Sequence, residues 1–580
     1  MNKPTWKERF RYRLDNRMAR GSISMIRLLA LMTLLLVLLI TGLILAFGLQ
    51  EEPNVFSALW DTLAATINAW MPYSDDGRIG YVLLTALAAL IGLLFTSVLI
   101  GIIASAIEER LTELRKGSSR VLETGHTVVL GFEPGALTLL EQLVLAVGEG
   151  PHTFVLAEAM EKDEMEAAIR EYPVLPKHVK IICRNADITD PGALYCCNLP
   201  AASRIVVSPM PDERALKVVL AARKAREGGE VGIVAAVSSG KYLLPVSFCK
   251  AEKILLMNTG SLLARLIAHS CTQPGLSRAF SEVFSFAGSE FYAEQMPETA
   301  GLTFGEAVLR MENGALCGLY RQHKLYMNPA AAERLEAGDR LLLFEEKKGA
   351  ARLGAPVPVP ACTAGPCVQD AERTDRVVIL GENSYKDMIL KELPSDSEVV
   401  QAKDAESPPE QLVPWADHVV VLSGDEDRDR SDMKSVLLLI RLQELRRQAG
   451  LGYNITVELH REANRKLVTD EGGTDFVVAS DMASMVLAQL AETPALFVMF
   501  RELLSSEGNE LVLRPVSRFA LTPGGTYGTA ALRQAALQAH CCFLGLCRRD
   551  GDGFRFSMDP GRDASFTVRE TDQLVVLARA

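Results

Sequence analysis

Two long apolar stretches near the N-terminus constrain this chain most. Residues 28–49 and 81–107 contain no charged side chain. About 20 apolar residues span the hydrocarbon of a bilayer, so we expect two transmembrane helices. A secretory signal peptide is the alternative for the first stretch. That stretch exceeds an ordinary signal core, however, and no small-residue cleavage site follows it.

The charges around the two stretches predict their orientation. Eight basic residues precede the first stretch: Lys3, Lys7, Arg9, Arg11, Arg13, Arg17, Arg20 and Arg27. The segment between the stretches is mainly acidic, with Glu51, Glu52, Asp61, Asp75 and Asp76 against Arg78. By the positive-inside rule, we expect a multi-pass protein of the cell membrane with both termini in the cytoplasm.

The segment that connects the stretches has the pattern of a pore loop. Residues 54–70 are apolar with helical spacing but are too short to span a bilayer. The turn that follows is irregular, and we expect it to form the selectivity region: Met71, Pro72, Tyr73, Ser74, Asp75 and Asp76. Repeated around an axis, its two carboxylates would favour cations over anions. The alternative is an interfacial hairpin between two anchor helices. Two helices enclose no pore, so conduction requires several subunits.

The remaining chain alternates strands with helices. After a charged stretch at 108–120, strands are expected near 126–131, 153–156, 179–183, 204–207 and 231–236, and helices at 132–147, 161–172 and 212–226. This alternation predicts a doubly wound parallel sheet, a Rossmann-like α/β module. Gly131 and Gly135 follow the first strand and Glu158 follows the second, as in a nucleotide-binding fingerprint. The middle glycine is missing, so a purely structural turn is an equal alternative.

A repeat divides this part of the chain into two related modules. Residues 254–291 correspond to 476–511, and residues 301–345 correspond to pieces of 524–578, so each module ends in a small β-rich lobe. Only about fifteen residues separate the expected strands at 398–401 and 417–423, so we expect the second module to lack one strand–helix element. The expected domains are a cytoplasmic juxtamembrane segment (1–27), a transmembrane pore domain (28–107), a linker (108–125), a first module (126–348), a flexible Pro/Ala/Gly-rich linker (349–374) and a second module (375–580).

Three stretches resemble the CASTOR/POLLUX family of ion channels, which is related to RCK (regulator of conductance, TrkA-like) proteins. They are FRYRLDNRMARG, QPGLSRAFSEVFSFAGSEFY and ENSYKDMILKELPSDSEV. The resemblance implies a homotetramer in which eight RCK modules form a ring that gates a pore for potassium, sodium or calcium. Calcium sensitivity occurs in such channels. The loop MPYSDDG matches no filter of the family, which leaves the permeant cation open. The shortened second module leaves open any ligand site there.

Two sets of residues are candidates for regulation. Gly92 and Gly101 lie in the second apolar stretch and are either a gating hinge or close-packing positions. The densest acidic cluster, a candidate calcium site, is Asp425, Glu426, Asp427, Asp429 and Asp432. A smaller set is Asp187, Asp190, Asp212 and Glu213. The alternative for both sets is ordinary acidic residues at helix N-termini. A regulatory nucleotide is the other ligand expected.

Composition excludes several function classes. A net charge of −11 argues against a nucleic-acid partner. The 11 cysteines show neither zinc-site spacing nor a disulfide framework and predict reduced cytoplasmic thiols. The eight histidines form no catalytic pattern, so we expect no enzyme. The alternatives are a membrane-tethered NAD-dependent oxidoreductase and a TrkA-like regulatory subunit of a separate cation transporter.

Overall fold

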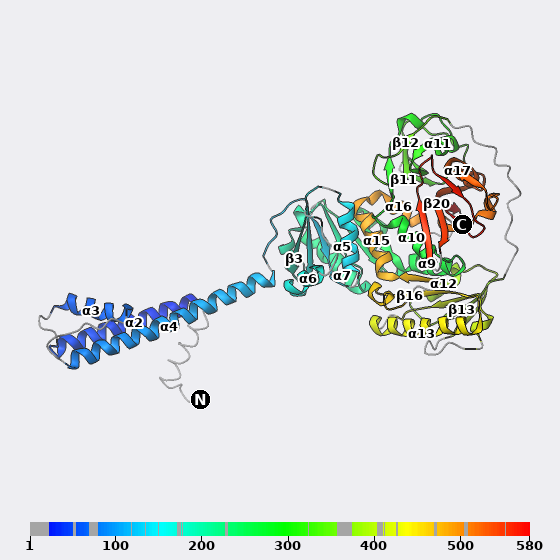
Figure 1. Cartoon of the computed structure of the whole chain (residues 1–580). Coiled ribbons are helices and arrows are strands. Elements are labelled where there is room, and N and C mark those ends of the chain that lie inside the picture. The colour runs from blue at the N-terminus through cyan, green and yellow to red at the C-terminus, as the bar shows by residue number, and fades with distance from the viewer. Residues whose placement is uncertain are drawn as a thin grey trace. The chain divides into compact units, whose positions relative to one another are not determined.

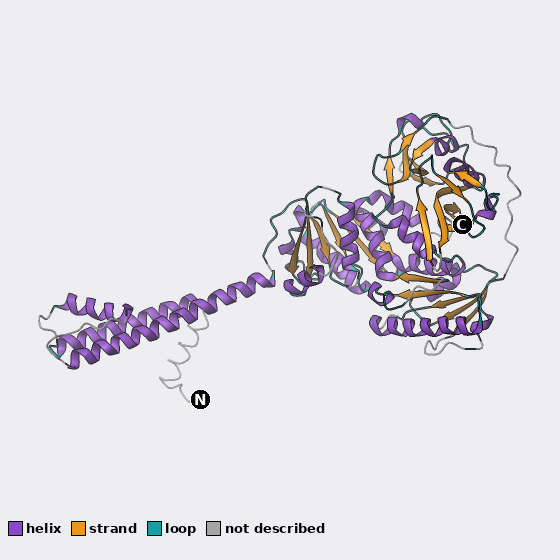
Figure 2. Ribbon diagram, viewed as in Figure 1, coloured by secondary structure: helices purple, strands orange, loops and turns teal. Residues whose placement is uncertain are grey.

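The computed structural model divides the chain into two units, residues Met1–Gly117 and Ser118–Ala580. It describes residues 22–49, 54–68, 79–117, 119–133, 135–148, 150–170, 176, 178–226, 230–322, 324–356, 374–402, 410, 412–424, 427–468, 473–503, 508–550 and 553–579. Helices dominate the first unit, and sheets covered by helices form the second (Figure 2).

The first unit contains three helices: α2 (Ser22–Ala46), α3 (Val55–Asn68) and α4 (Ile79–Lys116) (Figure 1). Leu29–Ala46 in α2 and Ile79–Ser105 in α4 are long and apolar enough to cross a membrane. Leu, Ile, Val and Ala make up most of both segments, and neither contains a proline, so nothing interrupts the helical hydrogen bonds. Helix α4 extends beyond the apolar stretch to Lys116, so the charged residues after Ile107 continue the second membrane-length helix.

Small and hydroxyl-bearing side chains, together with Ile40 and Ile44 of α2, fill the space between these helices. Ala58, Ala65 and Ala88 are at most 1% exposed, whereas the large side chains of α2 and α4 point mainly outward. Four buried threonines each donate a hydrogen bond to the carbonyl four residues earlier: Thr41, Thr62, Thr66 and Thr85. Such pairing satisfies hydroxyl groups inside an apolar bundle and lets helices approach closely.

The first module contains a six-stranded parallel sheet with the order β3-β2-β1-β4-β5-β6. Its strands are β1 (Thr127–Leu130), β2 (His152–Glu158), β3 (Val179–Asn185), β4 (Arg204–Val207), β5 (Gly232–Val237) and β6 (Ile254–Asn258). Its helices are α5 (Ala136–Ala146), α6 (Lys162–Arg170), α7 (Asp212–Ala225) and α8 (Val246–Ala251). The central strands are buried on both faces, as a covered parallel sheet requires. The predicted doubly wound fold is confirmed.

The second module repeats this plan with the order β14-β13-β15-β16-β17. Its strands are β13 (Arg376–Leu380), β14 (Glu398–Ala402), β15 (His418–Val421), β16 (Asn454–Leu459) and β17 (Thr474–Val478). Its helices are α12 (Lys386–Glu392), α13 (Arg428–Ala449) and α14 (Glu462–Arg465). Among the residues described here, no strand corresponds to β3, which confirms the predicted loss of one strand from the second module.

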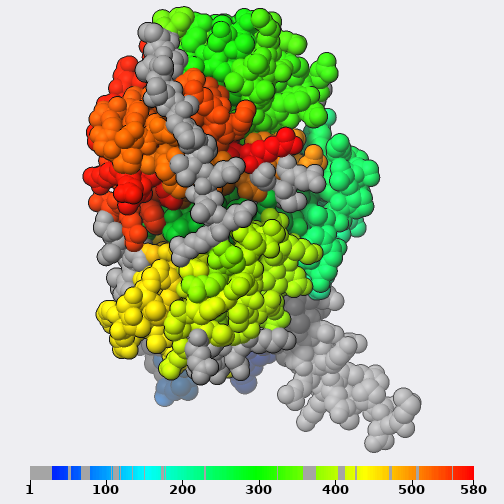
Figure 3. All heavy atoms as spheres, turned by 90° about the vertical axis from the view of Figure 1, so that its right-hand side faces the viewer, coloured from blue at the N-terminus to red at the C-terminus, as the bar shows by residue number. Residues whose placement is uncertain are grey.

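Each module ends in an antiparallel lobe, and the two lobes have the same strand order. The first is β10-β9-β11-β7 and the second, written from its other edge, is β21-β20-β23-β18. The strands are β7 (Glu290–Glu294), β9 (Ala315–Arg321), β10 (Lys324–Met327) and β11 (Arg340–Glu345), then β18 (Asn509–Pro515), β20 (Cys541–Asp550), β21 (Gly553–Met558) and β23 (Gln573–Arg579). The lobes carry α11 (Phe304–Arg310) and α17 (Thr529–Gln538) and pack against each other (Figure 3). The predicted repeat of β-rich lobes is confirmed.

The two modules exchange helices. Helix α9 (Thr259–Thr272) follows the first sheet but packs against α12 and strands β15 to β17 of the second. Helix α15 (Ala479–Glu492) follows the second sheet but packs against α5, β4 and β5 of the first, and α5 and α15 lie side by side in Figure 1. One hydrophobic core therefore runs through both modules.

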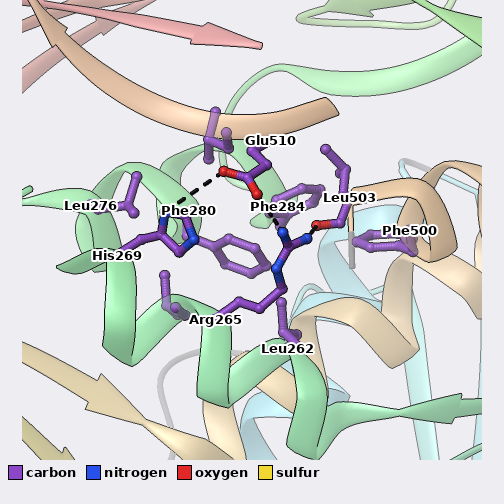
Figure 4. Close-up of a pocket in the computed structure, with 11 residues that line it drawn as sticks. Leu262, Arg265, His269, Leu276, Phe280, Phe284, Phe500, Leu503 and Glu510 are labelled. Carbon is purple, nitrogen blue, oxygen red and sulfur yellow. Dashed lines mark hydrogen bonds and ion pairs between the residues drawn. The ribbon is translucent and has the colours of Figure 1, made fainter. Parts of the chain in front are cut away.

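Arg265 of α9 fastens this exchange with ion pairs and a hydrogen bond, of which Figure 4 shows those to Glu510 and Leu503. Its Nε lies 2.9 Å from Glu392 of α12, and its Nη1 donates to the carbonyl of Leu503 in α16 (Phe497–Leu503) at 2.9 Å. Its Nη2 pairs with Glu510 of β18. The side chain is 8% exposed and lies beside Phe280, Phe284 and other apolar residues. One guanidinium of the first module thus holds three elements of the second.

We expect Arg265→Ala to destabilise the protein by ~3–5 kcal/mol, because it removes the arginine partner of Glu392 and leaves Glu510 with only His269, at 3.7 Å. Arg170→Ala is the control, since its ion pair with Glu166 is solvent-exposed, and we expect it to cost less than ~1 kcal/mol. Thermal unfolding of the full chain in detergent measures both variants. Equal melting temperatures for the two variants would contradict the prediction that the ion pairs of Arg265 stabilise the protein.

Candidate functional site

The short helix α3 is the first candidate site. Its 14 residues measure about 21 Å along the axis, less than the hydrocarbon thickness. It packs against both α2 and α4, and the Asn54 side chain accepts a hydrogen bond from the Phe56 amide at its start. A short apolar helix packed against two membrane-length helices is the arrangement expected for a pore helix. The predicted selectivity residues (Met71, Pro72, Tyr73, Ser74, Asp75 and Asp76) lie outside the described part of the chain.

Gly92 and Gly101 have different surroundings in α4. A Cβ added to Gly92 would overlap the carbonyl oxygen of Thr66 in α3, so only glycine permits this approach. A Cβ added to Gly101 would meet no atom within 4 Å. The geometry therefore favours the close-packing interpretation at Gly92, and the hinge hypothesis stays a prediction at Gly101.

The structure brings the three candidate nucleotide-binding residues of the first module together. Gly131 and Gly135 follow β1 with φ angles of 107° and 97°, and Glu158 ends β2. Glu158 accepts hydrogen bonds from the amides of Phe132 and Ala159 and pairs with Arg214 at 2.6 Å. The ribose-recognising position is therefore engaged by groups of the chain itself.

The start of α5, where a pyrophosphate would bind, is also covered. Ser484 of α15 donates a hydrogen bond to the carbonyl of Gly135 at 2.9 Å, and a Cβ on Gly135 would lie 2.9 Å from that of Ser480. One turn further along α5, Thr138 donates to Asp481, whose pKa burial raises to about 6. Nucleotide binding at the fingerprint stays a prediction and requires movement of α15 and Arg214.

A cavity of about 810 Å³ lies between the two modules, at the carboxyl ends of their strands. Four helices begin at its wall, with the first residues Asp212 (α7), Thr259 (α9), Arg428 (α13) and Ala479 (α15). The carboxyl edge of a parallel sheet is where open α/β folds bind ligands. We call this cavity the inter-module cleft.

Asp212 and Asp432 play the same structural part in the two modules. Asp212 accepts hydrogen bonds from the amides of Ser238 and Ser239, at 2.7 and 2.9 Å. Asp432 accepts from the amides of His460 and Arg461, at 2.8 and 3.1 Å. Each carboxylate thus fastens the turn after the corresponding strand, β5 or β16. This use of backbone donors explains both aspartates without a metal ion.

The other candidate metal ligands also have partners within the chain. Asp427 caps α13 by accepting from the Arg430 amide at 3.2 Å, and Asp429 pairs with Arg461 at 2.8 Å. In the first module, Thr189 donates to Asp187 and lowers its pKa, Asp190 accepts from Gly192, and Glu213 accepts from Tyr242. Asp425 and Glu426 lie outside the described residues. Within the described part, no group of three or more Asp, Glu, His or Cys residues is placed to hold a metal ion.

Sequence reasoning missed three residues with unusual surroundings. Lys241 and Arg428 line the inter-module cleft and make no ion pair with described residues, although the Lys241 Nζ lies 5.2 Å from the Tyr242 ring centroid. No sequence pattern distinguishes them from other surface bases. Glu458 is fully buried at the end of β16, where burial raises its pKa to about 8. A lone acid in the apolar strand NITVEL was the available signal for Glu458.

Known proteins with a similar sequence are ion channels. Residues 260–359 match the family profile described as "Castor and Pollux, part of voltage-gated ion channel". The chain is 23% identical to "Probable ion channel POLLUX" of Arabidopsis thaliana over 572 residues, covering 84% of this chain and 69% of the relative. It is 24% identical to "Ion channel CASTOR" of Lotus japonicus over 567 residues, covering 84% and 66%. The chain therefore spans about two thirds of the length of these relatives.

Among solved structures, the chain resembles the "Structure of the human SLO3 gating ring" with a TM-score of 0.52. The two share 12% identity, and the match covers 78% of this chain and 99% of the other. Apolar membrane helices followed by tandem Rossmann-like modules of the RCK type define the class of protein. Within that class, the chain is similar to the CASTOR/POLLUX ion channels, and the resemblance stated from the sequence is confirmed.

We expect Gly92→Ala to destabilise the membrane unit by ~1–3 kcal/mol, because the added methyl group overpacks the α3–α4 contact. Gly101→Ala is the matched control in the same helix and should leave stability unchanged, since its surroundings are open. Thermal aggregation of the full chain, followed by size-exclusion chromatography in detergent, measures both variants. A comparable loss of thermal stability in Gly92→Ala and Gly101→Ala would argue against close packing at Gly92.

Proposed function

We propose that this chain is the pore-forming subunit of a cation channel whose opening is controlled by its tandem RCK modules. The observation that most supports the proposal is α3, a 14-residue apolar helix packed against two membrane-length helices. Its length prevents it from spanning a bilayer, and its packing against α4 depends on a glycine. The similarity to proteins named as ion channels supports the same function.

The proposed channel is a homotetramer. One copy supplies two membrane-length helices and one short helix, which cannot enclose a pore. Four copies around an axis would bring Asp75 and Asp76 of each into a ring, and such a ring attracts cations. With both termini in the cytoplasm, the RCK modules of the four copies would form the regulatory ring, and the permeant ion is potassium, sodium or calcium.

The inter-module cleft is the proposed place of regulation. Its wall comes from both modules, so a ligand bound there contacts two bodies at once. A ligand shifts the equilibrium between two arrangements by its difference in affinity for them. Calcium and a nucleotide are the ligands we propose for the gate. Lys241 and Arg428, which have no ion pair among the described residues, favour the phosphate groups of a nucleotide within the cleft.

Neither alternative function gains support from a specific observation. A nicotinamide-dependent oxidoreductase needs an open fingerprint, whereas Ser484 and Arg214 engage Gly135 and Glu158 here. A TrkA-like accessory subunit has no use for a short helix like α3. The relatives are named as channels and not as enzymes.

Recording from the purified full chain in planar lipid bilayers tests the proposal. We expect discrete unit currents whose reversal potential in a salt gradient indicates cation permeation. The Asp75→Asn/Asp76→Asn variant should lower the cation-to-anion permeability ratio severalfold, because it removes the ring of charge. Glu51→Gln/Glu52→Gln removes as much charge from the same connector and should have a smaller effect. Absence of current from the purified chain would contradict a pore-forming role, and turnover of a pyridine nucleotide would favour the oxidoreductase.

A further inference from the structure

The segment before β1 is fastened along one edge of the first module. Residues 119–126 run beside the two short 3₁₀ helices η1 (Ala193–Cys197) and η2 (Leu199–Ala201). The amide of Val121 donates to the carbonyl of Cys196, and that of Gly125 donates to Ala201, both at 2.8 Å. Only Gly117 and Ser118 separate Lys116, the last residue of α4, from this fastened segment.

Arg120 makes the first side-chain contacts of the fastened segment. Its Nη1 donates to the Tyr195 hydroxyl at 2.7 Å, and its Nη2 donates to the Asn198 carboxamide oxygen at 3.1 Å. The guanidinium carbon lies 4.4 Å from the centroid of the Tyr195 ring, within the range of a cation–π interaction. The nitrogen of the same Asn198 carboxamide donates to the carbonyl of Glu123 at 3.2 Å. We call Arg120, Tyr195 and Asn198 the linker clamp.

Val121, the next residue, is a hydrophobic anchor. Its side chain is 1% exposed and belongs to the same core cluster as Leu194, Ile205 and Val207. A close-packed core transmits displacement because its side chains have no room to yield. Movement of this part of the first module therefore displaces the backbone at Val121.

Strand β4 connects the segment that holds the clamp with the wall of the inter-module cleft. Helices η1 and η2 precede β4, a strand whose last three residues are at most 1% exposed. Beyond its carboxyl end, the chain passes through Pro209 and Met210 at the cleft wall. At its other end, Arg204 pairs with Glu492 of α15, the helix supplied by the second module. Strand β4 thus contacts the second module at one end, leads to the cleft wall at the other, and directly follows the η1–η2 segment that holds the clamp.

We propose that the linker clamp is the point at which movement of the RCK modules is transferred to α4. The proposal rests on the proposed channel function. Arg120 acts as a positioning residue: it fixes the chain that follows α4 to the 3₁₀ segment, so that displacement of β4 and that segment is passed on to the helix. When the clamp is broken, residues 119–126 separate from this edge of the module, and less of the displacement reaches α4.

Two measurements on the full chain test the proposal. Hydrogen exchange in detergent reports whether the clamp holds residues 119–126, and single-channel recording reports whether it couples the modules to the pore. The test variants are Arg120→Ala, which removes the clamp, and Tyr195→Phe, which keeps the ring but removes the hydroxyl acceptor. Lys180→Ala is the matched control, because it removes an exposed ion pair of the same segment, Lys180 with Glu123 at 2.7 Å.

We expect Arg120→Ala to speed exchange in residues 119–126 at least tenfold and to change open probability at least threefold, with unit conductance unchanged. Tyr195→Phe should have a smaller effect in the same direction, and Lys180→Ala should match the unaltered chain in both measurements. An unchanged hydrogen-exchange rate of residues 119–126 in Arg120→Ala would overturn the proposal that the clamp holds this segment. Faster exchange with an unchanged open probability would overturn its coupling role. Absence of current from the unaltered chain would instead overturn the channel function, while the exchange result would still report on the clamp.

Discussion

The exchange of α9 and α15 between the two modules is the constraint on which the structure of the second unit depends. Each sheet has an apolar face that a helix from the other module covers, so neither module buries its core alone. Arg265 adds directional contacts to this exchange by pairing with two glutamates of the second module. The cleft is consequently lined by two modules that share one hydrophobic core.

The architecture of each module was largely predictable from local patterns, but their exchange was not. Apolar runs such as TVVL and HVVV identify buried parallel strands, and the short interval before β15 revealed that the second module lacks a strand. The repeat between 254–291 and 476–511 correctly paired α9 with α15 as equivalent helices. Sequence similarity between two repeats, however, does not indicate which sheet each helix covers. That information lies in tertiary packing between residues hundreds of positions apart, such as Arg265 with Glu510.

The candidate site was predicted less completely, for a chemical reason. Asp212 and Asp432 look like metal ligands in the sequence because a carboxylate that accepts backbone amides has the same side chain as one that binds calcium. Conversely, Lys241 and Arg428 carry no distinguishing pattern, and only their position at the cleft wall gives them significance. Gly92 was recognised as a special position, and its role in packing followed once Thr66 was located against it.

The functional account depends on α3 entering the bilayer without crossing it, next to copies of itself. A cryo-electron microscopy map of the full chain in lipid nanodiscs tests this most directly. The account predicts a rotationally symmetric assembly in which each α3 ends partway through the membrane, with its C-terminal end directed toward the axis. A map with α3 lying flat on the membrane surface, away from any symmetry axis, would contradict the account and leave an anchored sensor.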